Sequence, residues 1–321
     1  MQYKSFRDID KAIDILCEEG KIEQAMRLLK EGVQTLPAEE YADNEFLITL
    51  VEAILYTECK QYEACFDIVS KGVERGWAFP LRFARYQPMK ELPGAEALWE
   101  RNNRLLGQEQ ANARVEYKVV LPEGFNPEKK YPLFMALHGH GVCNIKEFSG
   151  YWKPDRFTER GFIFAYIQSS QVVCHGGYGW LDDLTIGNRD IKFCYDKITA
   201  AYPIDESTVM IGGFSGGAIA SLNFLFSEII PIQGFITLCP EMKPDAFTPE
   251  AVRRAAQRGV RGVFLEGELV QPIACEQEML RTFEAEDLPC RYVINRGIGH
   301  EAPDDLDDKL ASSLAFVLGL H

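Results

Sequence analysis

The first third of the chain carries apolar residues at helical spacing. Apolar positions three and four residues apart recur in several stretches, and turn-forming residues such as Gly20 and Pro37 separate them. The stretches cover residues 9–16, 22–33, 38–57, 61–74 and 94–106. We therefore predict an all-helical domain over residues 1–108, with one continuous third helix over residues 38–57.

Two segments of this helical part look alike. Residues 20–25 (Gly-Lys-Ile-Glu-Gln-Ala) and 59–64 (Cys-Lys-Gln-Tyr-Glu-Ala) each open a helix after a short turn. They resemble the tetratricopeptide (TPR) pattern of paired helices, which repeats about every 34 residues. The resemblance implies a pair of TPR-like helical hairpins. Such a module would cover a pocket, self-associate or bind a protein partner.

The hydrophobic pattern changes near residue 111. Short apolar runs of strand length now alternate with helical patterns, and this alternation is typical of a mainly parallel sheet with helices on both faces. The predicted strands cover residues 114–121, 131–138, 162–167, 209–211, 235–239, 260–265 and 292–294. We therefore predict an α/β domain over residues 109–321. A dinucleotide-binding fold is disfavoured because no G-x-G-x-x-G follows the first strand.

One strand-to-helix junction organises this second domain. The apolar run 209–211 leads into Gly213-Phe214-Ser215-Gly216-Gly217, which fits G-x-S-x-G and precedes a run of small and apolar residues. A serine at such a sharp turn is presented above the sheet edge, and glycines on both sides let strand and helix approach. We predict a nucleophile elbow at Ser215. The amide of Gly216, at the start of the helix, would stabilise an oxyanion.

Composition narrows the partners. The formal charge is −14 and the pI about 4.9, which disfavours nucleic acid and anionic membranes because both require a basic surface. There is no apolar signal segment at the start and no long apolar run. The nine cysteines form no C-x-x-C pair, so we expect reduced thiols in a cytoplasmic protein, with no zinc site.

A serine nucleophile needs a general base, and few histidines are available for that role. The chain has five histidines, at positions 138, 140, 175, 300 and 321. His300 lies in a glycine-rich loop directly after the last predicted strand, whereas His321 is terminal. Such a loop can place an imidazole over Ser215 at the carboxyl edge of the sheet. We predict His300 as the catalytic base.

A second oxyanion donor is expected from the loop after the strand at 131–138. This loop reads Leu137-His138-Gly139-His140-Gly141, and its glycines allow close backbone approach. We predict the amide of His140 as the donor, with Gly141 as the alternative. His138 and His140 are not predicted as metal ligands, because side chains two apart at a strand end project to opposite sides and no further ligand cluster is evident.

These motifs resemble the α/β-hydrolase superfamily, and in particular bacterial serine esterases of the carboxylesterase/phospholipase and dienelactone-hydrolase type. The resemblance covers about residues 115–318, through the Leu-His-Gly-x-Gly loop, the segment from Gly212 to Ala218 and Gly299-His300. It implies hydrolysis of a small-molecule carboxylic ester through an acyl-enzyme, without a cofactor. The aromatic side chains of Tyr178, Trp180 and Phe214 are expected to line the substrate pocket.

The resemblance breaks at the acid of the triad. Such enzymes usually carry an aspartate where this chain has Val270, and valine cannot orient an imidazole. We predict Glu268, on the same loop, as the substitute. Glu241, after the preceding strand, is the second candidate.

The missing aspartate also motivates an alternative function. The hydrolase domain would then be a catalytically weak binding or sensing module, with the helical domain as the protein-interaction part. Retention of Ser215, His300 and the glycine-rich turns argues against it, because a dead site has no need of strained turn chemistry. A peptidase of the oligopeptidase type is disfavoured because 108 helical residues cannot form the propeller domain of that group.

Overall fold

The computed structural model describes residues 3–141, 143–146, 152–270 and 273–320. The chain divides into two compact units. The first comprises Met1–Asn112 with Val172–Gly176, and the second comprises Ala113–Gln171 with Gly177–His321.

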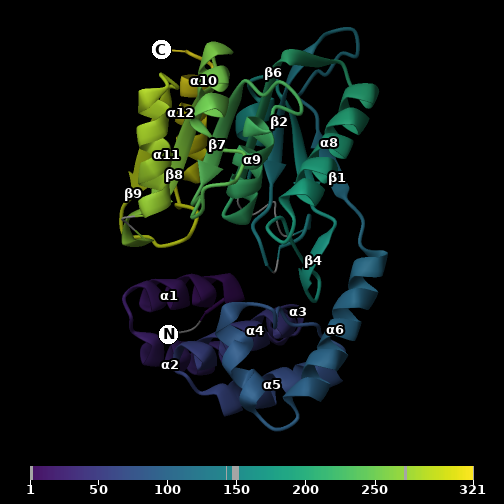
Figure 1. The fold of residues 1–321 in the computed structure, drawn as a ribbon, viewed down its shortest axis with the longest axis vertical. Coiled ribbons are helices and arrows are strands. Elements are labelled where there is room, and N and C mark those ends of the chain that lie inside the picture. Colours follow the sequence, from purple (N-terminus) through teal and green to yellow (C-terminus); the bar gives the residue numbers. More distant parts are fainter. Residues whose placement is uncertain (1–2, 142, 147–151, 271–272, 321) are drawn as a thin grey trace. The chain divides into compact units, whose positions relative to one another are not determined.

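The first unit is helical, as its apolar spacing predicts (Figure 1). Consecutive helices α1 and α2 pack against each other, as do α4 and α5. The apolar faces of α1, α2 and α4 meet in a small core that includes Phe6, Ile9, Leu29 and Leu55. The helical elements are α1 (Phe6–Glu18), α2 (Ile22–Val33), α3 (Ala38–Asp43), α4 (Glu45–Glu58), α5 (Tyr62–Glu74), the 3-10 helix η1 (Ala84–Glu91) and α6 (Ala95–Asn112).

The prediction of one helix over residues 38–57 was wrong. The helix is interrupted at Asn44, whose backbone leaves the helical region at φ −109° and ψ 10°. The side-chain amide of Asn44 donates to the carbonyl of Glu40 at 2.8 Å. Asparagine bonds locally to the backbone in this way, and so it competes with continuation of the helix.

Residues 172–176 belong to the first unit although they lie far along the chain. The amide of His175 donates to the carbonyl of Ala78 at 2.7 Å, and its Nδ1 lies 2.8 Å from Oε1 of Glu109. Arg82 donates to the carbonyl of Val173 at 3.1 Å. His175 is therefore part of the helical unit.

The second unit is built on a seven-stranded sheet in the order β1-β3-β2-β6-β7-β8-β9 (Figure 1). β1 runs antiparallel to β3, and the other pairings are parallel. The strands of the sheet are β1 (Glu116–Val120), β2 (Tyr131–Leu137), β3 (Ile163–Gln168), β6 (Ile204–Phe214), β7 (Gly234–Leu238), β8 (Arg261–Gly267) and β9 (Cys290–Asn295). Two short strands that the pattern does not predict, β4 (Gln171–Cys174) and β5 (Gly177–Gly179), lie outside it.

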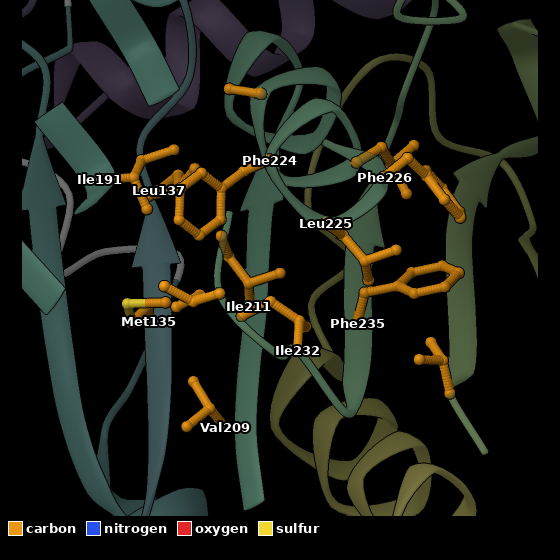
Figure 2. Packing of buried hydrophobic residues seen from close by; sticks show 14 of the residues in the cluster. Met135, Leu137, Ile191, Val209, Ile211, Phe224, Leu225, Phe226, Ile232 and Phe235 are labelled. Carbon is orange, nitrogen blue, oxygen red and sulfur yellow. The ribbon is translucent and has the colours of Figure 1, made fainter. Parts of the chain in front are cut away.

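Helices cover both faces of the sheet, which confirms the predicted α/β class with a mainly parallel sheet. One core cluster joins the sheet to α8 (Leu184–Ala201), α9 (Gly216–Phe226), α10 (Pro249–Gln257) and α11 (Ala274–Ala285). The other joins it to α7 (Asp155–Thr158) and α12 (Leu306–Val317). Figure 2 shows part of the first cluster, in which Leu137, Ile211 and Phe235 of the strands meet Phe224 and Leu225 of α9.

The helix after the predicted elbow is buried along its whole length. All 11 residues of α9 are buried, as is typical of a helix that is apolar on every side. Its first turn is therefore held from several directions, which positions the residue before it. No helix of the described part of the chain has the length and apolarity to cross a bilayer.

Candidate active site

Ser215 lies at a strained turn between β6 and α9. Its backbone has φ 54° and ψ −121°, a conformation that residues other than glycine adopt only when the surroundings enforce it. The strand and helix approach so closely that a Cβ on Gly213 would lie 2.3 Å from the carbonyl carbon of Gly217. Glycine is therefore required there, and the local geometry is that of the predicted nucleophile elbow.

Hydrogen bonds at the carboxyl edge of the sheet hold this turn. The amide of Ser215 donates to the carbonyl of Leu238 at 2.8 Å, and the amide of Cys239 donates to the carbonyl of Leu265 at 3.0 Å. The elbow is thus tied to the end of β7, and β7 to β8. The side chain of Ser215 stays partly exposed, so a substrate can reach it.

The loop after β2 lies against the first turn of α9. Leu137 pairs with Gly213 in the sheet, which brings the following residues beside the elbow. A Cβ on Gly216 would lie 2.5 Å from Cβ of His140 and 3.3 Å from its backbone nitrogen. The backbone of His140 and the first residue of α9 are therefore neighbours. Amides at this position, at a helix N-terminus, can stabilise negative charge next to Ser215.

Gly141, the alternative oxyanion donor, is engaged elsewhere. Its amide donates to the carbonyl of Tyr178 at 3.1 Å, and the amide of Tyr178 donates to the carbonyl of Cys143 at 2.9 Å. These bonds fasten the loop to the segment that carries Tyr178, which is half-buried. The amide of Gly141 is therefore already hydrogen-bonded within this loop, while the backbone of His140 is the part of the loop that lies against Gly216.

His138 is a buried structural residue. Its Nδ1 lies 2.6 Å from the carbonyl of Gly139, and its Nε2 accepts from the amide of Ser169 at 3.1 Å. Burial lowers the pKa of His138 to about 4, so the ring is neutral near pH 7. Among the residues that the structure describes, no three His, Cys, Asp or Glu side chains form a group suited to a metal ion.

Trp180 packs against the loop after β2 and is hydrogen-bonded to it. The side chain is completely buried, and its indole nitrogen donates to the carbonyl of His138 at 2.9 Å. Its backbone amide donates to Nδ1 of His140 at 3.2 Å. Trp180 therefore lies in the core, packed against this loop. Phe214, another of the predicted pocket aromatics, is half-buried, and its ring centroid lies 5.1 Å from that of the His300 imidazole.

The structure pairs His300 with Glu241. Nδ1 of His300 lies 3.2 Å from Oε1 of Glu241, a close contact that does not meet the geometry of a hydrogen bond. The contact with His300 lowers the pKa of the Glu241 carboxyl, which favours its ionised form. A carboxylate at Nδ1 leaves Nε2 as the basic nitrogen of the ring.

Glu268 binds the same loop at another point. Its carboxylate is exposed and accepts from the amide of Gly297 at 2.9 Å, whereas the carboxylate beside the His300 ring is that of Glu241. The sequence predicts Glu268 first and Glu241 second, but the structure places Glu241 next to the imidazole. The His300 loop also packs tightly on β8, because a Cβ on Gly267 would lie 2.0 Å from the carbonyl oxygen of Gly299.

Ser215 and His300 flank Phe214 on the same edge of the sheet. The described residues include no hydrogen bond between the two side chains. Catalytic hydrogen bonds are often long in enzymes without substrate and tighten in the complex. The arrangement therefore holds the Ser215 hydroxyl, an imidazole beside a carboxylate and a helix N-terminus within one loop cluster.

Sequence reasoning missed a group of buried polar side chains beside this cluster. Glu266, at the end of β8, and Glu276, in α11, have no exposed surface. Cys239, which follows β7, is also buried and has a positive φ of 53°. The one available signal is a glutamate inside the otherwise apolar run Val263-Phe264-Leu265-Glu266.

Comparison with known proteins finds similar structures only. No protein-family model matches the chain, and no curated protein does. An uncharacterized protein from Bacillus cereus ATCC 10987 matches 99% of this chain and 100% of its own length, with a TM-score of 0.55 and 19% identity. A ferulic acid esterase matches 65% of this chain and 94% of its own, with a TM-score of 0.49 and 18% identity. The first similarity shows a shared fold, and the second, at its TM-score, carries no functional argument.

Proposed function

We propose that the protein is a serine hydrolase that cleaves a carboxylic ester through an acyl-enzyme. One observation carries the proposal: Ser215 occupies a strained strand-to-helix turn beside the loop of His300, whose Nδ1 lies 3.2 Å from Oε1 of Glu241. Such strain persists only where the surrounding structure enforces it, and it clusters at functional sites. The resemblance of the sequence motifs to serine esterases supports an ester as the substrate class.

In the proposed reaction, Oγ of Ser215 attacks the ester carbonyl carbon while Nε2 of His300 takes the hydroxyl proton. The amides of Gly216 and His140 stabilise the negative oxygen of the tetrahedral intermediate. Its collapse breaks the bond to the alcohol oxygen, which receives the proton from His300, and leaves the acyl group on Ser215. Water, deprotonated by His300, then attacks the acyl-enzyme and releases the carboxylic acid.

In this scheme Glu241 orients the imidazole. The short contact to Nδ1 and the lowered pKa of the Glu241 carboxyl support that role, because an ionised carboxylate fixes the tautomer and stabilises the imidazolium that forms. Glu268 would instead hold the loop through Gly297. The alternative, a catalytically weak sensing module, was suggested by the valine at position 270. The carboxylate of Glu241 beside the His300 ring supports the hydrolase over this alternative.

We also propose a cytoplasmic location and a role for the helical unit in protein binding or self-association. The nine cysteines are free thiols, as expected for a reducing cytoplasm. The hairpins formed by α1 with α2 and by α4 with α5 support a TPR-like module for protein binding or self-association.

Steady-state hydrolysis of p-nitrophenyl esters of increasing chain length tests the function. The full chain should release p-nitrophenol with at least one ester, and Ser215→Ala should lose this activity. Turnover that persists in the Ser215→Ala protein would overturn the proposal, because the nucleophile would then lie elsewhere.

A further inference from the structure

A pair of buried carboxyl groups lies directly behind the candidate site. Glu266 is the residue before the end of β8, and Glu276 lies in the first turn of α11. Both side chains are completely buried. The proposed mechanism uses neither group, and burying two carboxylates is unfavourable unless each is neutralised or paired.

Among the residues that the structure describes, no positively charged side chain acts on Glu266. Its Oε1 accepts from the amide of Gly267 at 2.7 Å, whereas its buried Oε2 has no amide or hydroxyl donor. The groups that face it are the carboxyl of Glu276, from α11, and the thiol of Cys239, from the end of β7. Glu276 in turn accepts from the hydroxyl of Tyr292, on β9, at 2.9 Å.

Two carboxyl groups in this setting cannot both be ionised. Glu276 lies within hydrogen-bonding reach of Glu266, and two carboxyl groups can share a hydrogen bond only when one of them carries a proton. Burial, and then the contact with Glu276, raise the pKa of Glu266 to about 9. The shared proton is therefore present at neutral pH.

The pair is connected to both halves of the His300–Glu241 contact. Cys275, next to Glu276, donates through its thiol to the carbonyl of Glu241 at 2.9 Å. On the other side, Gly267 follows Glu266 and packs against the carbonyl of Gly299, the residue before His300. The carboxyl pair thus joins the start of α11, which holds Glu241, to the end of β8, which holds the His300 loop.

We propose that Glu266 and Glu276 are positioning residues that share one proton, and that this shared proton holds Glu241 against the imidazole of His300. The inference rests on the proposed function for its effect on turnover. Loss of the proton leaves two buried negative charges facing each other, and their repulsion separates β8 from α11. The site is then misaligned at alkaline pH although neither carboxyl touches the substrate.

The test compares Glu266→Gln, Glu266→Ala and the wild-type chain, with Glu284→Gln as a control. Glutamine imitates the protonated acid, because its amide can donate to Glu276 and accept from Gly267, but it cannot ionise. Alanine removes the donor altogether. Glu284 lies on the same helix and is exposed. Turnover and KM are measured from pH 6 to pH 10 with a p-nitrophenyl ester.

We expect Glu266→Ala to lower kcat by about 10- to 100-fold at pH 7 with KM little changed, as for a misplaced catalytic group. Glu266→Gln should recover most of that loss. The wild type and the control should lose activity as the pH approaches about 9, and Glu266→Gln should not share this loss. An identical alkaline decline in the wild type and in Glu266→Gln would overturn the proposal.

A readout without substrate separates this inference from the proposed function. In protein labelled with ¹⁵N-histidine, the ring resonances of His300 report its contact with Glu241. We expect Glu266→Ala to shift them in the same direction as Glu241→Gln does, and Glu266→Gln to leave them near the wild-type positions. Ring resonances unchanged in a folded Glu266→Ala protein would contradict the positioning role. A wild type that lacks ester turnover would contradict the proposed function alone.

Discussion

Nδ1 of His300 lies 3.2 Å from Oε1 of Glu241, and this contact supports Glu241 as the acid of the proposed triad. Glu241 follows β7, one strand earlier in the sheet than the loop where the resemblance places an aspartate. Parallel strands end at the same edge of a sheet, so loops of neighbouring strands can supply the same group. Which carboxylate lies next to His300 therefore depends on how far each loop extends along this edge, and the spacing of residues in the sequence does not determine it.

The first prediction concerns this acid. Replacing Glu241 with Gln should lower kcat by about 10³- to 10⁴-fold, because an amide cannot stabilise the imidazolium or hold the productive tautomer. Glu268→Gln is the matched control, since it removes a similar charge from the other side of the loop, and its kcat should change less than 10-fold. Steady-state kinetics with one ester measures both. A larger loss of kcat in Glu268→Gln than in Glu241→Gln would show that Glu268 is the acid.

The second prediction concerns the oxyanion site. In Gly216→Ala the added Cβ would meet Cβ of His140 at 2.5 Å, and the loop must move away from the helix. We expect kcat to fall by about 10²-fold or more, as when an oxyanion donor is lost. Gly107→Ala serves as the control because a Cβ there meets nothing within 4 Å. Equal turnover in the two variants would remove the loop after β2 from the proposed oxyanion site.

The third prediction concerns the support under that loop. Trp180 and Trp152 are both completely buried. Trp180 donates to the carbonyl of His138 at 2.9 Å, whereas the indole nitrogen of Trp152 has no hydrogen-bond partner among the described residues. Trp180→Phe should therefore destabilise the protein by about 1–3 kcal/mol more than Trp152→Phe, because it leaves a buried carbonyl without its donor. Urea titration of each variant measures the difference. Equal losses would assign the effect to packing.

The fourth prediction concerns acid pH. Because burial lowers the pKa of His138 to about 4 from an ordinary value of 6.5, the unfolded chain binds a proton that the folded chain refuses. The contribution of His138 to stability is thus complete above about pH 6.5 and is lost as the pH falls toward 4, by roughly 3 kcal/mol. The free energy of unfolding, measured between pH 4 and pH 7, should depend less on pH in His138→Gln than in the wild type. Equal slopes would show that the ring is protonated in the folded protein.

Much of the site could be predicted because its chemistry is local in sequence. The elbow requires glycines at fixed positions around Ser215, and the scarcity of histidines directs attention to His300. Local patterns also predict most helices and strands, although the bond from Asn44 to Glu40 breaks a helix that looks continuous.

What could not be predicted depends on which loops meet in space. Residues 172–176 carry no signal that they belong with the helical unit. Glu276 cannot be told apart in sequence from the exposed glutamates around it on α11, because only the fold brings it against Glu266. The choice between Glu241 and Glu268 depends on the same kind of non-local contact.

The central claim is that Ser215 forms an acyl-enzyme, and a pre-steady-state measurement tests it most directly. The full chain is mixed with an excess of a p-nitrophenyl ester that it hydrolyses, and the protein is quenched for mass spectrometry. The account predicts a burst of p-nitrophenol equal to the amount of protein and an acyl group on the peptide that contains Ser215, both absent in Ser215→Ala. Hydrolysis that leaves no adduct on that peptide, with a full burst retained in Ser215→Ala, would contradict the account.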